Sequence, residues 1–201
     1  MTELYLAEDG IPRCRWCSQV PEFLAYHDEE WGFPVADDRR LFEKVCLESF
    51  QSGLSWRTIL LKRENFRQAF CNFDYQQVAK FTEQDVERLL QNAGIIRHRG
   101  KIEATINNAK QVQAIIDEFG SLASYFWQYE VQPDSAISPQ TQSTSSESIA
   151  LSKDLKKRGW KFVGATTMYA LMQAMGLVND HVEGCHSRAK VAEARRAFAK
   201  P

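Results

Sequence analysis

The stretch L-K-K-R-G-W-K-F-V-G-A-T-T, residues 155–167, is the most informative part of this 201-residue chain. One helical segment ends at Gly159, a short hydrophobic turn follows, and a second helix begins near Gly164. Free backbone N–H groups at that helix start, up to Thr166, can bind a phosphate oxygen, and Lys161 adds positive charge. An ordinary connection between two helices has the same pattern. We favour phosphate binding because two glycines flank an aromatic and basic turn.

The chain on either side of this turn shows mostly helical periodicity. Helices are expected over residues 38–50, 57–70, 82 to about 94, 99–119 and 165–175. Thr82 and Asp85 form a capping-box pattern, and Gly120 and Gly176 end two of these helices. The helix over 99–119 is expected to bury one stripe, made of Ile102, Ile106, Ala109, Gln113 and Ile116. Strand-like alternation is almost absent, and the polar residues 131–148 are expected to form an exposed loop between two halves. The sequence therefore predicts an all-α fold.

Length and composition set the class of protein and its compartment. The length suits one main domain, and 44% hydrophobic with 25% charged residues is ordinary for a globular protein. We find no secretory signal at the N-terminus, and no apolar run approaches the roughly 20 residues of a membrane helix. We therefore expect a reducing, cytoplasmic setting, where the five cysteines serve as thiols or metal ligands rather than in disulfides.

The formal net charge of -1 argues mildly against a large nucleic-acid surface. Two basic clusters, over residues 97–101 and 153–161, reduce the force of that objection, because a small basic face can still bind a few phosphates. Each cluster has a simpler alternative as the solvated end of a helix.

Two cysteines and two histidines near opposite ends of the chain suggest a zinc site. Cys14 and His27 lie near the N-terminus, and His181 and Cys185 are spaced H-x-x-x-C near the C-terminus. That spacing lets both C-terminal side chains face one point on a helix or tight turn. Two sulfurs and two imidazoles make the closed tetrahedral site that structural zinc prefers. We expect one structural Zn²⁺ per chain, which joins the two ends and has no catalytic role.

Two alternatives to this ligand set stay open. The four side chains can be unrelated buried thiols and surface histidines. Within the zinc interpretation, Cys17 forms a C-x-x-C pair with Cys14, and His186 is a spare imidazole next to Cys185.

Glu48 is a candidate ligand-binding carboxylate. It lies seven residues after Leu41 and three after Val45, so it falls on the apolar stripe of its helix. A buried carboxylate is costly without hydrogen-bond partners, so Glu48 either meets a protein donor or waits for a ligand that donates. Trp56 follows in an aromatic, turn-forming segment, and a carboxylate beside it suits a flat ligand such as a purine. The alternative is a Glu that reaches solvent and a Trp of the core.

Together these motifs resemble the bacterial DNA-3-methyladenine glycosylase I family, within the helix-hairpin-helix glycosylases. The stretches that carry the resemblance are R-C-R-W at 13–16, A-Y-H-D-E-E-W-G at 25–32, L-E-S-F-Q-S-G-L-S-W at 47–56, residues 85–102, residues 151–167 and G-L-V-N-D-H-V-E-G-C at 176–185. The resemblance is collinear over residues 11–186. It sets apart an N-terminal extension, residues 1–10, and a basic helical tail, residues 187–201.

The resemblance implies a role for each candidate residue. Cys14, His27, His181 and Cys185 would bind zinc, and residues 155–167, with Lys161, Gly164 and Thr166, would hold DNA. Glu48 would hydrogen-bond the edge of a flipped adenine, and the pocket around it would be formed by Tyr26, Trp56 and the nearby Trp16. Phe23 departs from the pattern, because it stands where a pocket tyrosine is expected.

The resemblance also implies the reaction: a monomeric bacterial enzyme removes 3-methyladenine from double-stranded alkylated DNA by base flipping. Thr166 stands where related lyases carry a lysine, so no Schiff base and no strand cleavage are expected. Asn179 matches the position of a family aspartate, although the adjacent Asp180 leaves that register open. The alternative is a module of the same fold that binds alkylated DNA without cleaving it.

Overall fold

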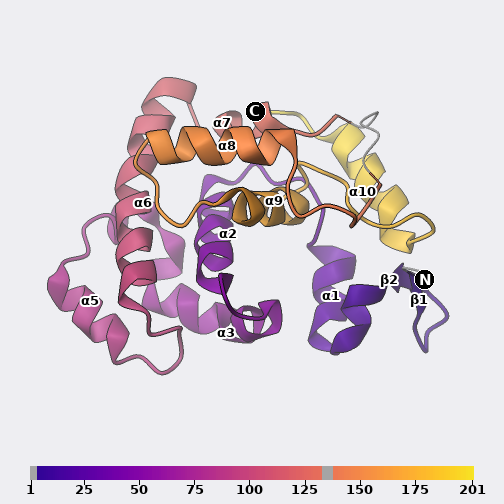
Figure 1. Ribbon diagram of the computed structural model, residues 1–201, viewed down its shortest axis with the longest axis horizontal. Coiled ribbons are helices and arrows are strands. Elements are labelled where there is room, and N and C mark those ends of the chain that lie inside the picture. Colours follow the sequence, from indigo (N-terminus) through magenta and orange to yellow (C-terminus); the bar gives the residue numbers. More distant parts are fainter. Residues whose placement is uncertain (1–3, 133–137) are drawn as a thin grey trace.

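The computed structural model describes residues 4–132 and 138–201, and within them the chain is mostly helical (Figure 1). In chain order the elements are β1 (Leu4–Leu6), β2 (Pro12–Cys14), η1 (Arg15–Gln19), α1 (Glu22–Glu29), α2 (Asp38–Gln51), α3 (Trp56–Ala69), η2 (Cys71–Phe73), α4 (Tyr75–Val78), α5 (Glu83–Leu90), α6 (Arg99–Phe119), α7 (Leu122–Phe126), η3 (Trp127–Tyr129), α8 (Ser146–Lys157), α9 (Ala165–Ala174) and α10 (His186–Ala197).

Helix α2 is the centre of the larger group of helices. Its N-cap is Asp37, whose side chain accepts a hydrogen bond of 2.8 Å from the backbone N–H of Arg40. Its apolar side chains are buried nearly all round, and it contacts α3, α6, α7 and α9. From Leu41 to Phe50 nearly every residue is buried, polar ones included, because other helices surround this part of α2. Glu48 is therefore carried into the interior.

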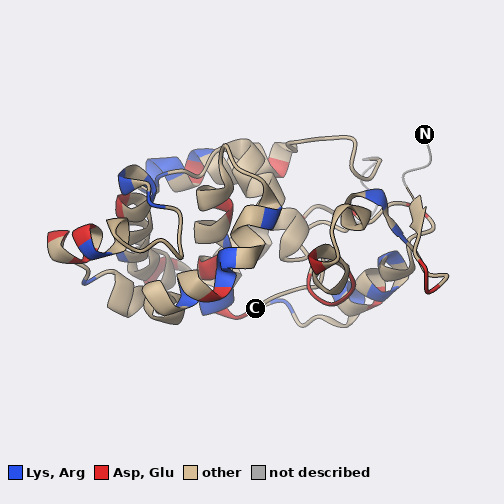
Figure 2. Ribbon diagram, turned by 90° about the horizontal axis from the view of Figure 1, so that it is seen from below, with Lys and Arg blue, Asp and Glu red and all other residues tan. Residues whose placement is uncertain are grey.

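A second group, made of the β1–β2 hairpin, α1 and α10, lies at the other end of the molecule in Figures 1 and 2. The two strands are antiparallel, with Leu4 opposite Cys14, and α10 contacts β2. The end of the chain folds back on the body: the ring of Phe198 lies 4.6 Å from that of Trp127. Residues 187–201 thus pack against the rest of the protein through an apolar contact.

Close backbone approaches bring the two ends of the chain together. Gly176 has φ +82°, and a Cβ built there would lie 2.6 Å from the Cα of Pro34, so only glycine fits without a shift of the backbone. Nearby, the backbone N–H of Gly32 donates to the carbonyl of Ala174, at 3.3 Å. The segment that leaves α9 is therefore held beside the segment that follows α1, which places residues 177–185 next to the N-terminal residues.

The long helices are confirmed, and so is the capping box of Thr82 and Asp85. The buried stripe of α6 is partly wrong, because Gln113 is exposed and the buried positions are instead Val112 and Ile115. Helical positions advance by about 3.6 residues per turn, so steps of three from Ala109 follow the core better than a step of four.

Two further expectations need correction. The N-terminal residues form a hairpin, whose strands are too short to show alternation in the sequence. The segment 131–148 is not all exposed loop: α8 begins at Ser146, after a capping box in which Ser145 and Ser148 bond each other's backbone N–H groups. Residues 133–137 of that segment lie outside the described part of the chain. Serines that cap a helix look like loop residues in a sequence, which explains the error.

Over the described residues, none of the helices has the length and apolarity required to cross a membrane.

Candidate functional site

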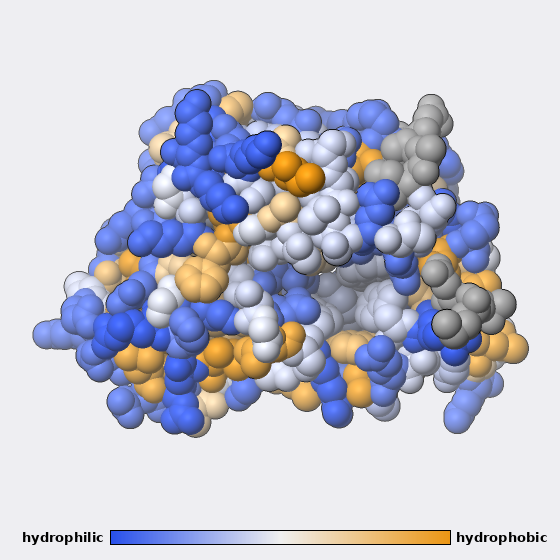
Figure 3. Space-filling view, in the orientation of Figure 1, coloured by the Kyte–Doolittle hydropathy of each residue, from blue (hydrophilic) through white to orange (hydrophobic). Residues whose placement is uncertain are grey.

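An aromatic cleft opens on the face seen in Figure 3, which is hollowed below α9. Its volume is about 350 Å³, and its walls include Trp16 of η1, Phe23 of α1 and Trp56 at the start of α3. The rings of Trp16 and Phe23 meet edge to face, with centroids 5.6 Å apart. Three residues that the sequence predicts for a base pocket therefore line one cleft, and its volume is within the range of small-ligand sites.

The other two predicted pocket residues are buried and do not line the cleft themselves. Tyr26 and Glu48 are both 6% exposed. The ring of Tyr26 is 5.3 Å from that of Trp56 and tilted by 44°. The structure thus brings Trp16, Phe23, Tyr26, Glu48 and Trp56 together from four separate elements.

Sequence reasoning missed Lys44, which lies among these groups. It is 5% exposed, and its Nζ is 2.8 Å from a carboxylate oxygen of Glu48 and donates to the hydroxyl of Tyr26 at 2.7 Å. The same atom lies 3.6 Å from the centroid of the Trp56 ring. Burial lowers the pKa of Lys44, and the charge of Glu48 opposes that effect. The four-residue spacing of Lys44 and Glu48 was the available signal, since it places both on one face of a helix.

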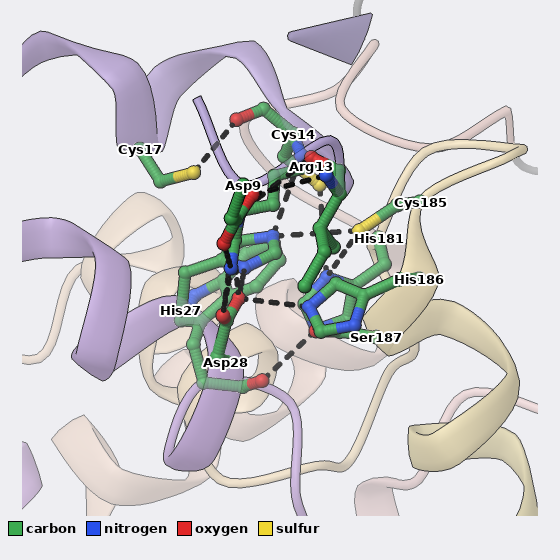
Figure 4. Close-up of polar contacts among 12 residues, drawn as sticks. Asp9, Arg13, Cys14, Cys17, His27, Asp28, His181, Cys185, His186 and Ser187 are labelled. Atoms are coloured by element: carbon green, nitrogen blue, oxygen red, sulfur yellow. Dashed lines mark hydrogen bonds and ion pairs between the residues drawn. The ribbon is translucent and has the colours of Figure 1, made fainter. Parts of the chain in front are cut away.

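The four predicted zinc ligands meet in one buried cluster (Figure 4). Cys14 ends β2, His27 lies on α1, and His181 and Cys185 come from the segment between α9 and α10. All four are at most 4% exposed, and their ligand atoms lie within 4.8 Å of one another. Residues that are more than 150 positions apart in sequence are therefore joined at one point.

The spacing within the cluster fits a tetrahedral metal. The Cys185 Sγ lies 3.5 Å from His27 Nε2 and 3.6 Å from His181 Nδ1, and Cys14 Sγ is also 3.6 Å from His181 Nδ1. Zinc bonds of about 2.3 Å to sulfur and 2.1 Å to nitrogen give S···N edges of about 3.6 Å in a tetrahedron. The thiol of Cys14, followed by the two imidazoles, lowers the pKa of Cys185, which favours the thiolate that a metal needs.

The outer nitrogen of each imidazole donates to an oxygen that fixes the ring. The Nδ1–H of His27 donates to Asp28 at 2.7 Å, and the Nε2–H of His181 donates to the carbonyl of Trp31 at 3.0 Å. Each remaining ring nitrogen then presents its lone pair to the sulfurs. Such hydrogen bonds to the far nitrogen are typical of histidines that bind metals.

The two rival ligands lie outside this cluster. The thiol of Cys17 donates to the carbonyl of Cys14 at 3.0 Å, and burial raises the pKa of Cys17 to about 12. His186 lies 2.9 Å from Asp28 and forms a second group with that carboxylate and His27. Asp28 also accepts from Arg13 at 2.8 Å, so its oxygens are shared among several donors. These contacts make His186 part of the support around Asp28.

The turn between α8 and α9 is fixed by side chains that bond its backbone. Asn108 of α6 accepts from the N–H of Lys161 at 2.8 Å and donates to its carbonyl at 2.9 Å. Ser49 donates to the carbonyl of Phe162 at 3.0 Å. The side chains of Lys161 and Thr166 are exposed, and Gly164 begins α9 without a side-chain cap. These hydrogen bonds hold the turn in place. The first backbone N–H groups of α9 have no carbonyl partner within the helix.

The two basic clusters differ in the structure. In the first, Lys101 is buried and donates to the carbonyls of Phe50 and Ser52, while Arg99 pairs with three glutamates. This cluster fits the alternative of a structural helix end. In the second, residues 153, 156, 157 and 161 are exposed lysines. Figure 2 shows Lys and Arg positions interspersed with Asp and Glu positions along the helices.

Asn179 and Asp180 lie away from the aromatic cleft. Both line a larger cavity of about 1030 Å³ between the segment before α10 and α10 itself. Asp180 accepts from Gln173 at 2.6 Å and from the backbone N–H of Gln140 at 2.9 Å. Whether the family aspartate position falls on Asn179 or on Asp180, it therefore lies outside the aromatic cleft.

This geometry agrees with the comparison to known proteins. Residues 16–189 match the methyladenine glycosylase family. The chain belongs to that family. The match includes the walls of the cleft, Glu48, the turn before α9 and three of the four clustered metal-ligand candidates.

Members of the methyladenine glycosylase family are similar to this chain over nearly their whole length. DNA-3-methyladenine glycosylase 1 of Escherichia coli (strain K12) is 52% identical, over 87% of this chain and 96% of that protein. DNA-3-methyladenine glycosylase of Haemophilus influenzae is 45% identical, over 86% and 96%. A crystal structure of a variant of 3-methyladenine DNA glycosylase I in complex with 3-methyladenine has a TM-score of 0.82, with 36% identity over 88% and 97% of the two chains.

Proposed function

We propose that this protein hydrolyses the N-glycosidic bond of 3-methyladenine in double-stranded alkylated DNA, releases the base and leaves an abasic site. The observation that carries the proposal is the cleft lined by Trp16, Phe23 and Trp56, in a chain of the methyladenine glycosylase family. Behind Trp56 lie the buried Tyr26, whose ring contacts it, and the buried Glu48, which is joined to it through Lys44. A base can reach such a pocket only if its nucleotide leaves the base stack.

The pocket chemistry suits an N3-alkylated adenine. The base stacks on Trp56, and its exocyclic amine donates to Glu48, which accepts as a carboxylate. Alkylation at N3 makes the base cationic, so the glycosidic bond is weak and the base leaves neutral. Binding by shape, stacking and one carboxylate then suffices, and water completes the hydrolysis.

Strand cleavage is not part of the proposed reaction. Thr166, which stands where related lyases carry a lysine, has a hydroxyl that forms no Schiff base. In a reaction with methylated duplex DNA, abasic sites should accumulate without nicks until alkali is added. Nicks that form at the same rate as abasic sites would show lyase activity and contradict this part of the proposal.

The turn before α9 is proposed to hold the DNA backbone. Its exposed Lys161 and the N–H groups from Gly164 onward can bind phosphates without reading the sequence. Replacement of Lys161 by Gln should weaken binding to duplexes of any sequence and lower the slope of log K against log salt by about 1. Lys190→Gln, on the exposed side of α10, is the matched control and should leave the slope unchanged. If the Lys161 variant keeps the wild-type slope, the DNA backbone does not contact this turn.

The four-residue cluster is proposed to bind one structural Zn²⁺ through Cys14, His27, His181 and Cys185. Bound zinc would stabilise the junction of the two chain ends, and because four protein ligands complete a tetrahedron, we assign it no catalytic step. The S···N distances of 3.5–3.6 Å and the two oriented imidazoles support this proposal.

The carboxylate of Asp28 should tighten zinc binding, because it fixes the His27 ring and increases its basicity. We expect Asp28→Asn to retain zinc about tenfold less tightly in competition with a chelator of known affinity. Asp9→Asn is the matched control: Asp9 bonds Arg13, as Asp28 does, but has no contact with His27 among the described residues. If both variants hold zinc as tightly as the wild type, Asp28 has no such role.

A further inference from the structure

The ammonium of Lys44 stands where the proposed function places a base. Its Nζ touches three groups at once: the carboxylate of Glu48 at 2.8 Å, the hydroxyl of Tyr26 at 2.7 Å and the face of Trp56 at 3.6 Å. These are the same three groups that would bond, line and stack a flipped adenine. One buried cation therefore uses the stacking face and the carboxylate that the ligand would need.

A purely structural ion pair is the simpler explanation, and the surroundings of Lys44 argue against it. Charge pairs that are fully buried contribute little net stability, because both ions lose their hydration. The further charges near Lys44 are Glu30, which ends α1, and Arg63 of α3, and they pair with each other at 2.6 Å. Lys44 instead lies over the indole face of Trp56, a residue that lines the cleft, and a cation over an indole face is an arrangement typical of sites that bind cations.

We propose that Lys44 is a displaceable occupant of the base pocket, which a flipped base must move from Trp56 and Glu48 before it can bind. The inference rests on the proposed function, since it takes the pocket to be the base site. The ammonium neutralises Glu48 and covers the Trp56 face in the free protein. A base that enters the pocket can stack on Trp56 and bond Glu48 only if Lys44 gives up its own contacts with these two groups. The loss of these Lys44 contacts therefore lowers the affinity of the pocket for any base.

Substitution of Lys44 by Met tests this competition, because Met has a similar length and no charge. We expect Lys44→Met to bind free 3-methyladenine about tenfold more tightly by calorimetric titration, a change of ~1.4 kcal/mol, within the range of a desolvated cation–π contact. A purely structural lysine predicts the opposite sign, since its loss would disturb the pocket. Lys62→Met is the matched control: this lysine of α3 donates to the carbonyls of Ala93 and Gly94 and should leave the affinity unchanged.

A second measurement uses the wild-type protein and so does not depend on the folding of the variant. In protein labelled with ¹³C at lysine, the Cε signal of Lys44 should be shifted by the Trp56 ring, and saturating 3-methyladenine should remove that shift. A wild type that binds 3-methyladenine with its Lys44 signal unmoved would overturn the inference and leave the proposed function intact. So would a folded Lys44→Met variant with equal or weaker binding. A wild type that binds no 3-methyladenine would overturn the proposed pocket, and the inference with it.

Discussion

Replacement of Glu48 by Gln should slow release of 3-methyladenine from methylated DNA by about 100-fold. The carboxylate is buried, 6% exposed, and in the proposed pocket its charge favours a base that carries a positive charge. A hydrogen bond to a charged group contributes about 1.5–3 kcal/mol, and a 100-fold loss corresponds to about 2.7 kcal/mol. The measurement is the single-turnover rate of base release at saturating enzyme, which separates the chemical step from DNA binding.

The control for this variant is Glu43→Gln on the same helix. Glu43 pairs with Arg67 outside the pocket, at 2.8 Å, so its loss should leave the rate unchanged. Glu48→Gln also leaves Lys44 buried without its counter-charge, which destabilises the fold. Rates are therefore compared well below the Tm of each variant. If the Glu48 variant matches the wild type under these conditions, the carboxylate does not contact the reacting base.

Replacement of Cys185 by Ser should empty the zinc site and strongly destabilise the protein. Cys185 lies within 3.6 Å of both imidazole nitrogens in the cluster, so its sulfur is central to the ligand set. Apparent binding energies of structural zinc, about 10–16 kcal/mol in small domains, are as large as the net stability of a typical fold. We expect about one zinc per wild-type chain, almost none in the variant, and a Tm lower by about 20 °C or more.

Cys17→Ser distinguishes zinc loss from the loss of any buried thiol. Cys17 is fully buried and three residues from Cys14, but its thiol bonds the Cys14 carbonyl instead of facing the cluster. This variant should keep one zinc per chain and most of the wild-type Tm. If wild-type protein purified without chelators holds no metal and remains folded, the proposed zinc site is wrong.

The sequence predicted the helical class because α2, α3, α6 and α9 carry long amphipathic or apolar patterns, which do not depend on distant partners. The short β1–β2 hairpin was not predicted, because strands of three residues are too short to show an alternating pattern and are stabilised by their pairing. The start of α8 was hidden by serines that cap it. Local chemistry of this kind resembles a loop until the backbone partners are known.

The candidate site was predicted as a set of residues, but its internal contacts were not. Glu48 was expected either to meet a protein donor or to await a ligand, and the structure shows the donor, Lys44, one helical turn earlier. The supports of the metal cluster include the carbonyl of Trp31, and a backbone atom leaves no mark in a sequence. Contacts between residues far apart in sequence, such as those of Asn108 with the turn before α9, could not be predicted either.

Release of free base from methylated duplex DNA by the wild-type protein tests the central claim most directly. The released bases are separated by chromatography and counted against the abasic sites left in the DNA. We predict that 3-methyladenine appears in solution, that abasic sites form in equal number, and that the strands stay intact. Protein that binds this DNA but releases no base would contradict the proposed hydrolysis and leave a module that recognises alkylated DNA without cleaving it.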